Sequence, residues 1–64
     1  MFCRIDVLTR EAKARRVVLT RYTTAASFEE AKGFAEHQRR AHGAEGFRIY
    51  DLHTGKAQEI WDLG

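Results

Sequence analysis

The segment 27-SFEEAKGFAEHQRRAHG-43 decides the fold, because it predicts one helix with a defined start and a defined end. Ser27 followed by Glu30 is a capping-box pattern: the serine oxygen accepts from the amide of residue 30, and the glutamate reaches back to the cap amide. Gly43 is placed to end the helix in a left-handed conformation. The stripe at helical spacing consists of Phe28, Ala31, Phe34, Ala35, Gln38 and Ala41.

Strand-like segments flank this helix on both sides. Their β-branched, aromatic and alternating residues occupy 2–9, 15–22, 46–52 and 57–63. The charged residues 10–14 are expected to form the loop of a first hairpin. The stretch 53-HTGK-56 is expected to form the turn of a second hairpin. We therefore predict an α+β fold of order ββαββ, with a four-stranded antiparallel sheet and one helix packed on one face.

Apolar side chains fall on both faces of these strands, although one helix covers only one face. Facing the helix we place Cys3, Ile5, Val7, Val17, Leu19, Phe47 and Ile49. The opposite face then collects Phe2, Leu8, Val18, Tyr22, Tyr50, Leu52 and one of Ile60 or Trp61, of which Trp61 is favoured. A one-residue slip in register would exchange the two faces. Under either register, an apolar and aromatic set is expected to remain outside.

Length and composition limit the possible classes of protein. With 64 residues, the chain is expected to form a single domain over 1–64. Its one cysteine excludes an internal disulfide, and a free thiol fits a reducing, cytoplasmic location. No apolar run approaches the roughly 20 residues of a membrane span. The formal net charge is +2, which is mild.

The sequence offers little for catalysis or metal binding. His37 and His42 are five residues apart and would point in different directions on a helix. Cys3 has no base placed beside it, and the aspartates are isolated from one another. The Thr-Gly-Lys order in 53–56 lacks the second glycine and the following helix of a phosphate-binding loop. We therefore predict a protein that is not an enzyme and that holds no cofactor or metal.

The outer face of the sheet is the candidate working surface. Large exposed apolar patches mark protein contacts, and symmetric homodimers are the commonest oligomers. The candidate interface comprises Phe2, Leu8, Val18, Tyr22, Tyr50, Leu52 and Trp61. The alternative is a nucleic-acid-binding module in which sheet aromatics stack on bases and arginines contact phosphates. Its candidate contacts are Arg4, Arg15, Arg16, Arg21 and Arg48. The modest net charge favours protein contact.

The segment 26-ASFEEAKGFAEHQRRAHGAEGFRIYDLHTGK-56 resembles a class of small bacterial domains of order strand-strand-helix-strand-strand, whose function is not established. The resemblance lies in the Ser-x-x-Glu-Ala helix start, the glycine that follows it, the next strand, and a hairpin similar to an Asp-x-x-Gly-Lys pattern. It implies the fold and assigns no functional residue. The same plan is also similar to some sheet-based DNA-binding domains.

Overall fold

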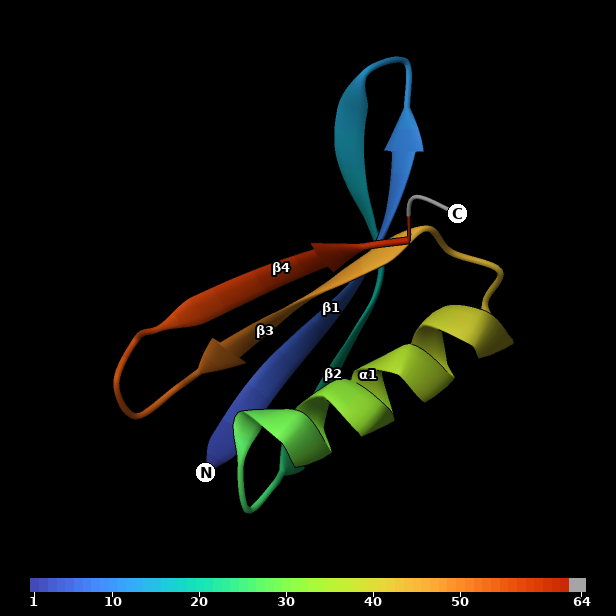
Figure 1. Cartoon of the computed structure of the whole chain (residues 1–64). Coiled ribbons are helices and arrows are strands. Elements are labelled where there is room, and N and C mark those ends of the chain that lie inside the picture. The colour runs from blue at the N-terminus through green and yellow to red at the C-terminus, as the bar shows by residue number, and fades with distance from the viewer. Residues whose placement is uncertain (63–64) are drawn as a thin grey trace.

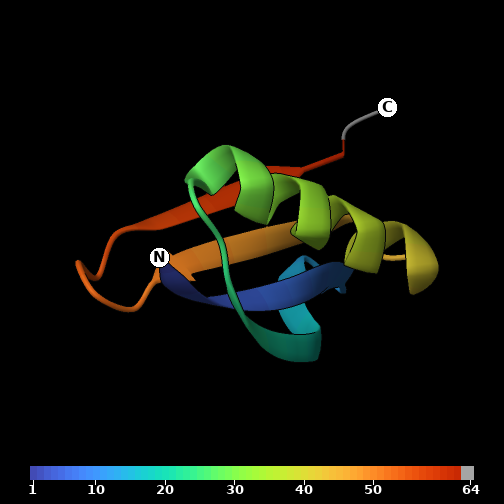
Figure 2. The same ribbon diagram turned by 90° about the horizontal axis from the view of Figure 1, so that it is seen from below.

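The computed structural model describes residues 1–62 and contains a four-stranded antiparallel sheet with one helix packed on one face (Figure 1). Its elements, in the predicted order, are β1 (Phe2–Glu11), β2 (Ala14–Thr24), α1 (Phe28–Ala41), β3 (Gly46–Asp51) and β4 (Ala57–Trp61). In space the strands are ordered β2-β1-β3-β4, so β1 and β3 join the two hairpins at the centre. Figure 2 shows α1 lying along one side of the sheet. The predicted α+β fold is confirmed.

The two ends of α1 follow the sequence signals closely. Ser27 is the N-cap, and its side chain accepts from the amide of Glu30 at 3.3 Å. The carboxylate of Glu30 returns to the amide of Ala26 at 3.1 Å, one residue before the amide expected for a capping box. Gly43 follows the helix with φ +61°, as predicted for a left-handed end.

The core lies between α1 and the two central strands. Ala31 and Ala35 are the buried helix residues, and their small side chains let the helix approach the sheet closely. The core cluster contains Cys3, Ile5, Ala25, Ala31, Ala35, Phe47 and Ile49, with Met1, Phe28, Phe34 and Ile60 packed against it. Four predicted helix-facing residues are thereby confirmed. Because Ile60 packs on this side, its neighbour Trp61 lies on the other.

A β-bulge interrupts the first hairpin. Val7 pairs with Leu19 but Leu8 pairs with Val17, so the register leaves Val18 without a direct partner in β1. The prediction that Val17 packs against the helix is wrong, since this residue is 46% exposed. Leu19 is only half-buried. The helix packs on β1 and β3, which leaves the edge strand β2 largely uncovered.

The first hairpin is longer than predicted. Its strands continue to Glu11 and resume at Ala14, so only Ala12 and Lys13 form the turn, with φ 51° and 71°. The expectation that residues 10–14 form a loop is therefore wrong. The sequence hid this turn because two-residue hairpin turns usually place glycine or asparagine at positive φ. We call residues 9–16 the arm; Figure 1 shows it projecting beyond the rest of the sheet.

The second hairpin closes as predicted around residues 53–56. Asp51 shapes this turn, because its Oδ1 accepts from the amides of His53 at 2.9 Å and Thr54 at 3.2 Å. Gly55 has φ +79° and donates its amide to the Asp51 carbonyl at 2.8 Å. The predicted fourth strand extended to Leu63, which lies outside the described residues.

Candidate functional site

The outer face of the sheet is organised around a buried carboxylate. Asp6 is 3% exposed and is the only charged residue in residues 1–62 that is buried. Its Oδ1 accepts from the hydroxyl of Thr20 at 2.9 Å, and its Oδ2 lies 3.2 Å from the guanidinium nitrogens of both Arg4 and Arg48. The strand register explains this convergence, because Asp6 pairs with Thr20 on one side and with Arg48 on the other. Nothing in the local sequence around Asp6 indicates these partners.

A second layer of contacts extends this arrangement over Tyr50. The guanidinium carbon of Arg4 lies 4.2 Å from the centre of the Tyr50 ring, and that of Arg48 lies 5.1 Å away. Cation–π contacts of this kind stabilise by about 0.5–2 kcal/mol each, depending on desolvation. Tyr50 is therefore half-buried beneath charged side chains, rather than exposed as a free stacking surface.

Glu59 lies on β4 and connects the charged residues of the sheet centre with the arm. It pairs with Arg48 in the sheet register, at 3.9 Å between charged atoms, and it forms an ion pair with Arg15 of the arm. The indole nitrogen of Trp61 donates to its Oε1 at 2.6 Å. These hydrogen bonds, that from Arg15 first among them, lower the pKa of Glu59. Arg10 lies over the Trp61 ring, 4.6 Å from its centre.

Trp61 is seated on a glycine. Gly46 pairs with Trp61 across β3 and β4, and a β-carbon added to Gly46 would lie 2.6 Å from the indole ring. The absent side chain thus makes room for the ring on the outer face. Leu8 was predicted to be exposed on this face, and that expectation is wrong, because it is 1% exposed.

One end of the outer face remains open. Phe2, Tyr22 and Leu52 are 50%, 60% and 44% exposed, respectively. The rings of Phe2 and Tyr22 are stacked, with centres 6.1 Å apart and planes 20° apart. The amide of Leu52 donates to the Phe2 carbonyl at 3.0 Å, and this hydrogen bond holds Leu52 beside Phe2. We call these three residues the open end. Val18 is also exposed, at the bulge.

The five arginines named as candidate phosphate contacts are mostly engaged within the chain. Arg4 and Arg48 hold Asp6, and Arg15 pairs with Glu59. Arg16 lies 2.7 Å from Glu11, in a pair that is well exposed. Within residues 1–62, no carboxylate lies at ion-pair distance from Arg21, whose guanidinium donates to the carbonyl of Thr20 at 3.3 Å. The arginines of the sheet centre are therefore poor phosphate ligands.

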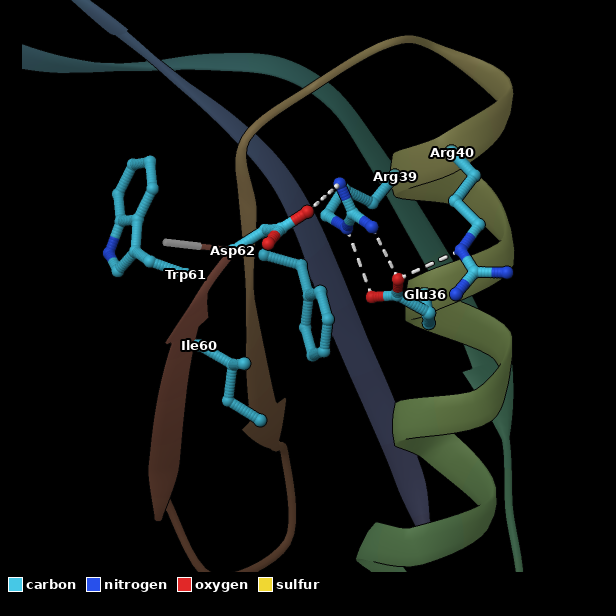
Figure 3. A pocket seen from close by; sticks show the side chains of 7 residues that line it. Glu36, Arg39, Arg40, Ile60, Trp61 and Asp62 are labelled. Carbon is cyan, nitrogen blue, oxygen red and sulfur yellow. Dashed lines mark hydrogen bonds and ion pairs between the residues drawn. The ribbon is translucent and has the colours of Figure 1, made fainter. Parts of the chain in front are cut away.

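A groove that sequence analysis did not anticipate lies between the end of α1 and β4 (Figure 3). It has a volume of about 260 Å³, and its lining residues are Glu36, Arg39, Arg40, Phe47, Ile60, Trp61 and Asp62. Figure 3 shows the Trp61 ring pointing away from the groove. Arg39 donates to both carboxylate oxygens of Glu36 and lies 3.3 Å from Asp62. The charged side chains that line the groove are thus paired with one another.

Three further features of residues 1–62 concern metal ligands, the Cys3 thiol and the length of the helix. Among residues 1–62, no group of three or more His, Cys, Asp or Glu side chains is arranged to hold a metal ion. Burial raises the pKa of the Cys3 thiol, which disfavours the nucleophilic thiolate. No helix within this range is long and apolar enough to cross a bilayer.

Comparisons with protein-family models, curated proteins and solved structures found no significant match to this chain.

Proposed function

We propose that this chain is a non-enzymatic interaction domain that forms a homodimer through the open end of its outer sheet face. The supporting observation is the exposure of Phe2, Tyr22 and Leu52 as neighbours at one end of a face whose centre is occupied by paired charges. Contiguous exposed apolar groups on small domains commonly mark protein contacts.

A second copy is the preferred partner because the open end carries no charge. Two identical apolar surfaces can meet across a two-fold axis without bringing like charges together. The charged row of Arg4, Asp6, Arg48 and Glu59 lies next to it and is paired internally, so it can form a polar rim. A chain of 64 residues also buries a smaller fraction of its surface than a larger domain, so dimer formation adds needed apolar burial.

Sedimentation velocity over a range of protein concentrations tests this proposal. The wild-type chain should dimerise as its concentration rises to the high micromolar range. Tyr22→Glu places a charge in the open end and should give a monomer with an unchanged circular dichroism spectrum. The matched control is His37→Glu, at an exposed position of α1, which should leave dimerisation intact. A wild-type chain that stays monomeric at the highest concentration would refute the proposal.

A further inference from the structure

Positively charged side chains are concentrated on the arm, which is only two strands wide. Residues 9–16 contain four cations, Arg10, Lys13, Arg15 and Arg16, against the single carboxylate of Glu11. All of them are exposed. The β1–β3 pairing ends at Leu8 and Gly46, so β3 pairs with no residue of the arm. The arm is therefore a two-stranded ribbon with a formal charge of +3 that extends past the central strands (Figure 1).

The cations are distributed over both faces of this ribbon and its tip. Arg10 is directly opposite Arg15, so these two share one face. Arg16 is opposite Thr9, on the other face. Lys13 occupies the turn, and no carboxylate within residues 1–62 lies at ion-pair distance from it. A ribbon charged on all sides suits a partner that surrounds it with negative charge, rather than a flat surface that meets one face.

The base of the arm is held in a fixed direction. One carboxylate oxygen of Glu45 accepts from the Thr9 hydroxyl at 2.8 Å and from the Arg10 amide at 3.2 Å. These bonds lower the pKa of Glu45. On the opposite strand, Arg15 is tied to Glu59 of β4. Such anchoring reduces the entropy lost when the arm binds a partner.

We propose that the arm is a DNA-binding ribbon that enters the major groove of a duplex and contacts phosphates on both walls. The major groove is about 12 Å wide and admits a two-stranded β-ribbon, whereas that of an RNA duplex is deep and narrow. The only apolar residues of the arm are Ala12 and Ala14, so it lacks the large anchors on which protein interfaces depend. A polyanion needs no such anchor. The proposal concerns a different surface from the open end and holds for a monomer or a dimer.

The salt dependence of binding follows from the number of cations. Because Arg15 is held by Glu59, the cations available to phosphates are Arg10, Lys13 and Arg16. If these three neutralise phosphates, log K should fall with log salt with a slope of about −2.7. A fourfold increase in salt would then weaken binding by about 40-fold. Because this contribution is independent of base sequence, a short labelled duplex of arbitrary sequence is a sufficient probe.

Fluorescence anisotropy with wild-type protein and two double variants tests the proposal. Lys13→Asn with Arg16→Gln removes two arm charges, and asparagine suits the left-handed backbone of the turn. This variant should bind more weakly and lower the magnitude of the salt slope by about 2. The matched control, Lys32→Gln with Arg40→Gln, removes the same charge from α1 and should bind as the wild type does. If the arm double variant is unfolded by circular dichroism, Lys13→Asn alone should lower the slope by about 1.

Competition experiments identify the class of partner. Unlabelled DNA duplex should displace the probe better than an RNA duplex or polyglutamate at equal charge. Equal displacement by polyglutamate would replace DNA with an acidic protein as the partner, and equal displacement by an RNA duplex would remove the major-groove assignment. Absence of DNA binding at low salt, or equal slopes for the arm and helix variants, would overturn the proposal.

Discussion

Replacing Asp6 by asparagine should cause a large loss of stability. The substitution keeps the size of the side chain but removes the buried negative charge on which Arg4 and Arg48 converge. An amide NH₂ group also places donors against the donors of those guanidinium groups. The Nε atoms of both arginines are already buried without a hydrogen-bond partner among residues 1–62, so the two side chains depend on Asp6.

The expected loss is about 3 kcal/mol. Removing one member of a buried ion pair costs about 3–5 kcal/mol, because the remaining charge is left uncompensated. The lower end applies here because the side chains of Arg4 and Arg48 retain 34% and 22% exposure and can recover some hydration. At 0.05–0.15 kcal/mol per residue, a domain of 64 residues has a total stability of roughly 3–10 kcal/mol. The variant would therefore lose a large share of its folded population.

Urea unfolding followed by Trp61 fluorescence measures this loss. Glu11→Gln is the control, since it breaks the exposed pair with Arg16 and should cost below about 1 kcal/mol. A triple variant with Met at Arg4, Leu at Asp6 and Met at Arg48 removes all three charges. It should be more stable than Asp6→Asn, because no buried charge is left unpaired. A loss below about 1 kcal/mol for Asp6→Asn, or a triple variant no more stable than it, would refute this reasoning.

Two further predictions concern the glycines and the helix ion pair. Gly33→Ala should stabilise the fold by about 0.5–1 kcal/mol, since this helical position has open space around it. Gly46→Ala should destabilise it by about 1–3 kcal/mol and shift Trp61 fluorescence, because the new methyl group would also lie 2.8 Å from a backbone oxygen. Equal effects of the two substitutions in thermal unfolding would contradict this prediction. Hydrogen bonds from Arg39 lower the pKa of Glu36 from 4.5 to about 2. Its contribution to stability should therefore be complete above pH 4.5 and be lost as pH falls toward 2, and Glu36→Gln should flatten the pH profile in that window.

The order of elements could be predicted because its signals are local. Ser27 and Gly43 mark the ends of α1 within a few residues of the chain, and the strands on each side are rich in β-branched and aromatic residues. The length of the arm could not be predicted, because Ala12 and Lys13 adopt positive φ without the residues that normally announce such a turn. The position of Val17 was missed because the bulge is a property of the pairing between two strands.

The composition of the outer face was hidden for a different reason. Arg48 and Asp6 are 42 residues apart in the chain, and only the β1–β3 register brings them together. From the sequence alone, the arginines were therefore expected to be available for a partner, and the aspartates were expected to be isolated from one another. A similar pairing across strands places Trp61 over Gly46. In the sequence this glycine resembles a simple strand boundary, but in the structure it leaves the space that the indole ring occupies.

These pairings also show what covers the face of the sheet opposite the helix. Much of that face is covered by its own side chains, since Arg4 and Arg48 lie over Tyr50 and Arg10 lies over Trp61. Apart from the exposed Val17 and Val18 at the bulge, the two surfaces proposed for partners have opposite character. The open end is apolar and uncharged, and the arm is charged and nearly devoid of large apolar groups. Because salt weakens contacts to phosphates but hardly weakens apolar burial, raising ionic strength should abolish binding by the arm while leaving association through the open end intact.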